Sequence, residues 1–274
     1  MSGAAERPIG VFDSGIGGLT VVRELWRQLP GESVVYFGDT ARVPYGPKSP
    51  DTVRRYAREA VAFLHSRGVK LIVVACNTAT AHAIDALARE APVPVVGVIQ
   101  PGARAAVAAT RSGRIGVIGT AGTIASGAYD REVRRLLPSA CVFAQACPLF
   151  VPIVEEGWFD HPATHLIAEE YLRPLHDVDI DVLILGCTHY PLLAPALQRT
   201  LGPSIRLVDS AEETVADVRR LLAERALLRG SPPPRHTFAV SDSPQHFRDT
   251  ARHFLGRSLD HVEQVNVDGY DRPA

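Results

Sequence analysis

The 274-residue sequence contains few lysines and few cysteines, and each shortage excludes a class of chemistry. Lys48 and Lys70 are its two lysines, while every other basic residue is an arginine or a histidine. Schiff-base chemistry, including pyridoxal phosphate catalysis, therefore has only two candidate residues. Lys48 stands in a proline-rich loop and Lys70 opens an apolar strand, so neither is typical of a cofactor lysine. The four cysteines are too few for a disulfide scaffold.

Long apolar runs and a strong net charge are also lacking. No uncharged run approaches the roughly 18 apolar residues that a membrane helix needs, and the first residues lack the apolar core of a secretory signal. The formal charge of −1 argues against a nucleic-acid-binding surface. With 46% hydrophobic and 22% charged residues, the chain has the composition of a globular protein. We therefore expect a soluble cytoplasmic protein without nucleic-acid or membrane partners.

Short β-branched runs alternate with longer segments of helical period, which is typical of α/β proteins with parallel sheets. Strands are predicted at 9–13, 33–37, 70–75, 95–98, 114–118, 141–147, 182–186, 206–208 and 236–240. Helices are predicted at 17–29, 51–67, 80–90, 129–137, 164–175, 212–228 and 244–254. The run Gly-Ser-Pro-Pro-Pro predicts a linker or rigid turn at 230–234.

Two pairs of similar segments occur in the same order along the chain. The segment that begins at Ile9, IGVFDSG, resembles the segment IGVIGTA that begins at Ile115. Likewise, the strand before Cys76 resembles the strand before Cys187. Any two parallel strands that end in small residues look partly alike, but the matching order favours a duplication.

The duplication predicts two similar open parallel-sheet α/β domains that face each other across a central cleft. We expect one domain to contain residues 1–98 and 209–274, and the other to contain residues 99–208. Ligands of open α/β sheets bind at the carboxyl ends of the strands, where the polar clusters of this sequence stand.

The glycine-rich segment Asp13-Ser14-Gly15-Ile16-Gly17-Gly18 matches no nucleotide-binding motif. Thr20 stands where the dinucleotide fingerprint needs its last small residue, and the lysine of a phosphate-binding loop is missing. A tight strand-to-helix turn remains, whose free amides could hold a small anion such as a carboxylate. The alternative is a close-packed turn without a ligand.

Cys76 and Cys187 each end an apolar strand and precede polar residues. Cys141 and Cys147 lie in or beside an apolar strand and are interpreted as packed small residues. No Cys-x-x-Cys pair is present, and Cys187 with His189 supplies at most two ligands, so no metal site is expected.

Two thiols in equivalent positions of two facing halves suit the inversion of configuration at carbon. That reaction needs one proton-transfer group on each face, one ionised and one protonated. A thiol pKa near ~8.5 can be brought within reach of neutral pH by neighbouring charges. Two alternatives remain: a thiol hydrolase or lyase that uses Cys187 with His189, and a two-lobed binding protein without catalysis.

Six segments together resemble the aspartate/glutamate racemase superfamily, and within it the glutamate racemases. They are IGVFDSGIGGLTVVREL, YFGDTARVPYG, VVACNTATAHAI, VIGTAGTIASGAY, CPLFVPIVEEG and LILGCTHYPLL, which lie in order between Pro8 and about Asp209. The resemblance implies a cofactor-independent enzyme that interconverts L- and D-glutamate and supplies D-glutamate for peptidoglycan synthesis. It also implies a homodimer. An aspartate racemase or another amino-acid racemase of the superfamily is the alternative.

The resemblance also implies roles for individual residues. Cys76 would take the α-proton from D-glutamate, and Cys187 would take it from L-glutamate. The implied supporting catalytic residues are Asp13, Asp39, Glu155 and His189, with Glu155 preferred to Glu156 by its spacing from the CPLF segment. The implied substrate-binding residues are Asp13, Ser14, Tyr45, Gly46, Asn77, Thr78, Thr188 and His189.

Overall fold

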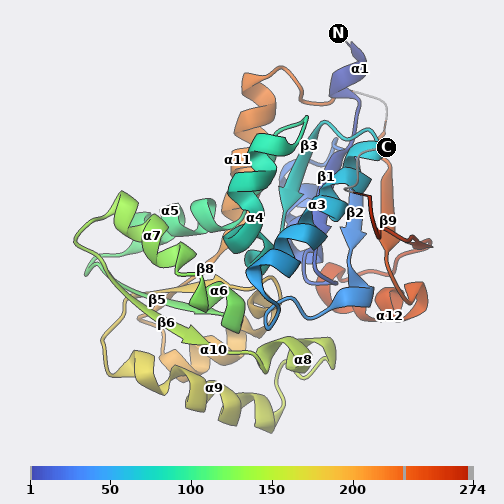
Figure 1. Cartoon of the computed structure of the whole chain (residues 1–274). Helices are drawn as coiled ribbons and strands as arrows, with labels where there is room; N and C mark the ends of the chain where they lie inside the picture. The colour runs from blue at the N-terminus through green and yellow to red at the C-terminus, as the bar shows by residue number, and fades with distance from the viewer. Residues whose placement is uncertain (1, 231–232, 271–274) are drawn as a thin grey trace.

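The chain forms two α/β halves, each built on one parallel sheet (Figure 1). The computed structural model describes residues 2–230 and 233–270. Sheet A contains β1 (Ile9–Asp13), β2 (Val34–Gly38), β3 (Leu71–Val74), β4 (Val95–Gly97), β9 (His236–Val240) and β10 (Glu263–Gln264). Sheet B contains β5 (Arg114–Gly119), β6 (Cys141–Ala146), β7 (Val182–Gly186) and β8 (Arg206–Asp209). The predicted class, parallel-sheet α/β with two similar halves, is confirmed.

The two sheets repeat the same strand order. The first four strands of sheet A lie in the order β2-β1-β3-β4, and sheet B lies in the order β6-β5-β7-β8. In both halves the first strand is therefore central, between the second and the third. Strands β9 and β10 extend sheet A beyond β2. Strands β1 and β5 occupy equivalent positions in the two sheets, and so do β3 and β7. These are the two pairs of segments that resemble each other in sequence.

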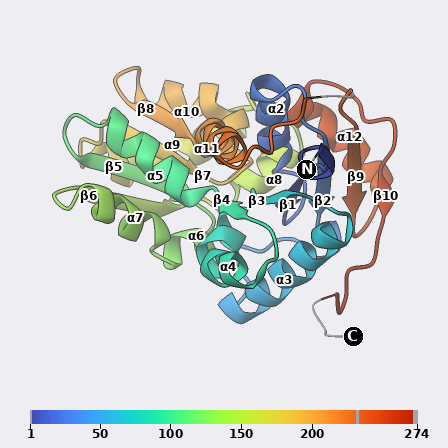
Figure 2. The same cartoon turned by 90° about the horizontal axis from the view of Figure 1, so that it is seen from above.

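Helices cover the faces of both sheets (Figure 2). They are α1 (Ser2–Ala5), α2 (Leu19–Gln28), α3 (Pro50–Ser66), α4 (Asn77–Glu90), α5 (Ile99–Ala109), α6 (Ala121–Ala125), α7 (Ala128–Leu136), α8 (Phe150–Glu155), α9 (Pro162–His176), α10 (Ala194–Leu201), α11 (Ser210–Glu224) and α12 (Pro244–Leu255), with short 3₁₀ turns at Thr40–Arg42 and Tyr190–Leu193. Helix α11 packs against α2 of one half and α5 of the other. Since sheet A uses residues before 98 and after 209, we propose domain boundaries near those positions.

Every strand predicted from the sequence is present, with ends that differ by at most one residue. Strand β10 and the helices α1, α5, α6, α8 and α10 were not predicted from the sequence. Helix α5 was missed because Pro101 and Gly102 resemble a helix break. Pro101 lies in the first turn, where its missing N–H costs no hydrogen bond, and a Cβ on Gly102 would lie 3.0 Å from Ser210 Cβ.

Two predicted helix boundaries are wrong for local reasons. Helix α4 begins at Asn77 rather than at 80, because the sulfur of Cys76 accepts a hydrogen bond from the Ala79 amide at 3.4 Å and caps the helix. Helix α11 ends at Glu224 rather than at 228, because the chain reverses at Ala226 with a φ of 53°. Of the linker predicted at 230–234, residues 231–232 lie outside the described residues.

Burial of the central strands fixes the position of the polar residues that follow them. Strands β1, β2, β3 and β7 are buried at every residue, as expected for parallel strands covered on both faces.

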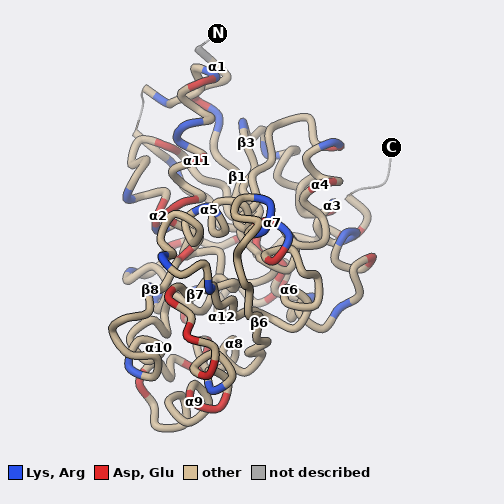
Figure 3. Tube along the Cα trace, turned by 90° about the vertical axis from the view of Figure 1, so that its left-hand side faces the viewer, with Lys and Arg blue, Asp and Glu red and all other residues tan. Residues whose placement is uncertain are grey.

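Basic and acidic positions are interspersed along the outer helices (Figure 3), with ion pairs such as Arg134–Asp130 at 2.8 Å. Within the described residues no helix is long and apolar enough to span a membrane.

Candidate active site

A cavity of about 280 Å³ lies at the carboxyl ends of the strands and brings Cys76 and Cys187 together. Its wall combines residues from both halves of the molecule. Ten of the predicted site residues line it, namely Ser14, Tyr45, Gly46, Cys76, Asn77, Thr78, Glu155, Cys187, Thr188 and His189. Gly15, Val43, Pro44, Thr120, Val151 and Pro152 complete the lining. Asp13 and Asp39 lie behind the wall, fully buried.

A larger cavity of about 350 Å³ lies between α4, α5, α7 and α11. Its lining contains Asp85, Arg131, Glu132, Asp217 and Arg220, but neither a cysteine nor a histidine. The smaller cavity holds two thiols and an imidazole, which are the side chains suited to nucleophilic attack and proton transfer near neutral pH. It is therefore the candidate active site.

Cys187 stands at the end of a chain of polar contacts. Its sulfur lies 3.8 Å from Nδ1 of His189, and Nε2 of His189 lies 2.9 Å from Oε1 of Glu155. Burial lowers the pKa of His189, but the hydrogen bonds with Cys187 and Glu155 outweigh it and raise the pKa to about 10. The imidazolium thus places a positive charge beside the Cys187 sulfur. Glu155, and not Glu156, makes this contact.

Cys76 has a different environment. The side chain is 5% exposed and stands at the N-terminus of α4. Burial raises the pKa of the Cys76 thiol to about 12, and the nearby Asp13 carboxylate raises it further, while the Ser14 hydroxyl opposes the shift. Cys76 is therefore held in the protonated form at neutral pH, whereas Cys187 has a cationic partner.

Two buried polar atoms beside the cavity lack a hydrogen-bond partner within the described chain. Asp13 accepts a hydrogen bond from the Gly15 amide at 2.9 Å through Oδ2, whereas Oδ1 is unpaired. Asn77 accepts a hydrogen bond from the Tyr129 hydroxyl at 2.7 Å, whereas its Nδ2 is unpaired. A buried polar group without a partner is costly, so a free acceptor and a free donor here fit a ligand with an ammonium group and a carboxylate.

Hydroxyl groups connect the two halves at the cavity. Thr78 Oγ1 lies 2.8 Å from Thr120 Oγ1 and 3.2 Å from Thr123 Oγ1. Close packing at the same boundary requires glycine, because a Cβ on Gly17 would lie 2.1 Å from Thr188 Oγ1. Glycine at this position thus brings the first half against the Cys187 loop of the second half.

Asp39 contacts Tyr45 rather than a thiol. It is fully buried, and its carboxylate accepts hydrogen bonds from Tyr45, Ser241 and Arg42. Among the described residues, neither cysteine makes a hydrogen bond with this carboxylate. Asp39 therefore supports the wall of the cavity through Tyr45. Its support of the thiols stays a prediction.

Several lining residues were not predicted from the sequence. Thr120 follows β5 as Ser14 follows β1, so the sequence duplication could have identified it as a site residue. Val43, Pro44, Val151 and Pro152 carry no chemical signal, because an apolar side chain at a cavity wall looks like a core residue in the sequence.

His189 is expected to remain protonated at pH 7 to 8, because its pKa is raised to about 10. The measurement is an NMR titration of the imidazole ring in ¹⁵N-histidine-labelled protein. Glu155→Gln removes the carboxylate that stabilises the imidazolium and should lower the pKa of His189. His165, which is less buried, gives a second ring in the same spectrum for calibration. A His189 ring that loses its proton below pH 7 in the unmodified protein would contradict this assignment.

Comparisons with known proteins identify the family. The family model described as Asp/Glu/Hydantoin racemase matches residues 9–218. A glutamate racemase of Geobacter metallireducens is 53% identical over 263 residues, which are 96% of this chain and 97% of that relative. The glutamate racemase of Francisella tularensis, solved in complex with D-glutamate, has a TM-score of 0.92 at 40% identity, over 97% of this chain and 100% of that chain.

A third relative gives the same result. The glutamate racemase of Thermus thermophilus, solved in complex with beta-chloro-D-alanine, has a TM-score of 0.87 at 48% identity. The two chains match over 95% of this one and 97% of that one. With its family match, its fold and a cavity that holds two thiols, this chain belongs to the Asp/Glu/Hydantoin racemase family and is a racemase.

Proposed function

We propose that this racemase interconverts L- and D-glutamate by direct proton transfer between two cysteines and the α-carbon. The observation that carries the proposal is the position of Cys76 and Cys187, which come from equivalent strand ends of the two halves and line one cavity. The relatives named glutamate racemase, which are about half identical over nearly the full chain, support glutamate as the substrate. The product D-glutamate would supply peptidoglycan synthesis.

The surroundings of the two sulfurs fit attack on the L-enantiomer. Cys187, whose sulfur lies 3.8 Å from Nδ1 of His189, is the base that removes the α-proton of L-glutamate. Cys76, whose pKa is raised to about 12, is the thiol that delivers its proton to the opposite face of the carbanion. Release of D-glutamate leaves Cys187 protonated and Cys76 ionised, which is the arrangement needed for the reverse reaction. One thiol and one thiolate are thus present in both directions.

The remaining residues hold the substrate. The unpaired amide of Asn77 and the hydroxyls of Thr78 and Thr188 are hydrogen-bond donors for carboxylate oxygens. The unpaired Oδ1 of Asp13 is an acceptor for the substrate ammonium. An ammonium held in its charged form acidifies the adjacent α-carbon and stabilises the carbanion. Ser14 contributes to this edge of the site through its contact with Cys76.

The thiol hydrolase reading would use Cys187 and His189 alone. It leaves Cys76 without a role, although Cys76 faces the same cavity. The racemase proposal gives both thiols a role, and the family match supports racemase activity.

We also propose that the enzyme acts in the cytoplasm as a homodimer. All four cysteines are free, which fits a reducing compartment. Leu149 and Trp158, at either end of α8, expose 49% and 45% of their surface, and apolar side chains of this size are common in subunit contacts.

A choice between glutamate and aspartate tests the substrate proposal. L-glutamate should be racemised with a kcat/KM at least about 100-fold higher than that for L-aspartate, because the shorter chain cannot bring its distal carboxylate to donors placed for glutamate without displacing its α-carbon from the thiols. Chiral chromatography of both amino acids after incubation with purified protein measures the ratio. Equal rates would overturn glutamate specificity while leaving the racemase assignment intact.

A further inference from the structure

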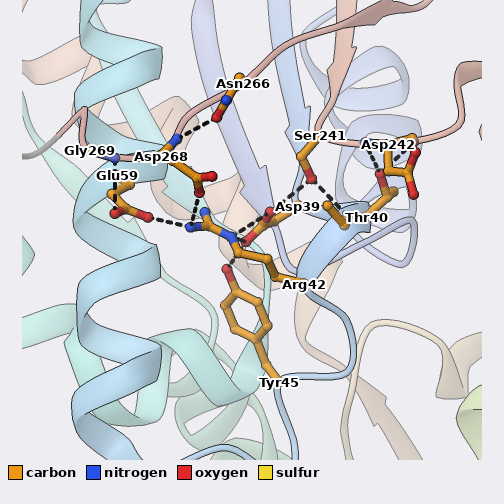
Figure 4. A network of polar contacts seen from close by, with 11 residues as sticks. Asp39, Thr40, Arg42, Tyr45, Glu59, Ser241, Asp242, Asn266, Asp268 and Gly269 are labelled. Atoms are coloured by element: carbon orange, nitrogen blue, oxygen red, sulfur yellow. Dashed lines mark hydrogen bonds and ion pairs between the residues drawn. The ribbon is translucent and has the colours of Figure 1, made fainter.

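Arg42 lies at the centre of a network of polar contacts around the buried Asp39 (Figure 4). Its Nε donates to both carboxylate oxygens of Asp39, at 3.0 and 2.8 Å, and its Nη1 donates to Glu59 and Asp268. The guanidinium carbon lies 4.0 Å from the centre of the Tyr56 ring. Arg42 does not line the cavity with the two thiols.

The charges of this network make Arg42 indispensable to Asp39. The Asp39 side chain is 0% exposed and that of Glu59 is 7% exposed, so water does not stabilise either carboxylate well. Arg42 is the cation that contacts both of them. Without it, two buried negative charges would face each other, and Asp39 would lose both of its charge-assisted hydrogen bonds.

Asp39 in turn fixes Tyr45, which is a wall of the cavity. The Tyr45 hydroxyl donates to Oδ2 of Asp39, and the Ser241 hydroxyl donates to Oδ1 at 2.9 Å. Tyr45 is 2% exposed, and its ring centre lies 5.7 Å from that of Tyr56. The carboxylate therefore sets the position of an aromatic ring that the substrate would touch.

The network also joins the cavity wall to the end of the chain. Asp268 contacts Arg42 at 3.3 Å, and the amide of Gly269 donates to Glu59 at 3.3 Å. Val267, between them and β10, is 2% exposed and packs in the hydrophobic core of the first half. The end of the chain thus supports Arg42 from the side opposite the cavity.

We propose that Arg42 is a positioning residue for substrate binding, which acts through Asp39 on Tyr45 and does not touch the substrate. This inference rests on the proposed glutamate racemisation. The thiols have supports of their own, since Cys76 caps α4 and Cys187 contacts His189. Loss of Arg42 therefore affects glutamate binding through the Tyr45 wall more than it affects proton transfer.

The test is a double-mutant cycle between Arg42→Gln and Tyr45→Phe, with kcat and KM measured for L-glutamate. Either single change should raise KM about ten-fold, which corresponds to about 1.4 kcal/mol of binding free energy, with kcat within about three-fold. If Arg42 acts through the Tyr45 hydroxyl, the KM of the double variant should differ less than two-fold from the KM of Tyr45→Phe alone. Multiplicative effects on KM would overturn the inference.

Arg67→Gln is the matched control. Arg67 also joins β10 to the end of α3, through an ion pair with Glu263 at 2.7 Å. Within the described residues it makes no hydrogen bond or ion pair with Asp39 or Tyr45. Its KM should remain within two-fold, and a ten-fold rise would show that any loosening of this region has the same effect, against a specific role for Arg42.

Two further results separate the possible failures. If Arg42→Gln does not fold, Tyr45→Phe decides alone, because an unchanged KM in that variant overturns the inference. If the unmodified protein does not racemise glutamate, the proposed function fails. If it does and Arg42→Gln leaves KM unchanged, only the inference about Arg42 fails.

Discussion

Replacing Cys187 with alanine is expected to lower kcat for racemisation at least about 10³-fold, and replacing Cys76 is expected to have an effect of the same size. Each alanine removes the proton-transfer group on one face of the α-carbon, and the thiol that remains reaches only the other face. The cavity walls and their carboxylate-binding groups are intact in both variants. Circular dichroism of the glutamate solution measures racemisation, and far-UV circular dichroism of the protein checks its fold.

Cys141→Ala and Cys147→Ala are the controls for this prediction. Cys141 is exposed and Cys147 is buried, and neither lines the cavity. Both variants should keep kcat within about three-fold. Racemisation at a near-normal rate by Cys76→Ala or Cys187→Ala would mean that the affected cysteine is not an obligatory base.

Deuterium from D₂O is expected to enter almost exclusively the product enantiomer at early times. When Cys187 removes the α-proton of L-glutamate, Cys76 delivers a different hydrogen, which has exchanged with the solvent. D-glutamate formed in D₂O should therefore carry deuterium at the α-carbon, while recovered L-glutamate should carry little. Chiral chromatography coupled to mass spectrometry measures both enantiomers in one sample.

Other mechanisms give different labelling. A single base that reaches both faces would return the original proton to a sizeable fraction of the product, or would label both enantiomers equally. A binding protein would label neither. The reaction started from D-glutamate is the internal control, because the roles of Cys76 and Cys187 reverse and the label should then enter L-glutamate.

The fold class could be read from the sequence because its signals are local. Parallel strands that are covered on both faces are continuous apolar runs, so β1, β3 and β7 stand out from the helices beside them. Glycine and proline hide other elements. Helix α5 carries both residues near its start and was missed, although each fits the helix once its surroundings are known.

Residue type and position determined the candidate thiols. Cys76 and Cys187 each follow an apolar strand within a similar local sequence, and strand ends of one sheet gather at one edge. The sequence could therefore predict that both thiols serve one cleft. It could not predict the raised pKa values of Cys76 and His189, because these depend on burial and on contacts with Asp13, Cys187 and Glu155 that only the fold creates.

The tertiary structure alone decided how the wall of the cavity is supported. Asp39 was expected to support the thiols, which stays a prediction, and its carboxylate binds Arg42, Tyr45 and Ser241. Ser241 lies 202 residues further along the chain and reaches Asp39 because β9 pairs with β2. The sequence shows which side chains follow each strand, and the types of these side chains determine the chemistry available to the protein. Which of them meet, and which are shielded from water, depends on long-range strand pairing and helix packing.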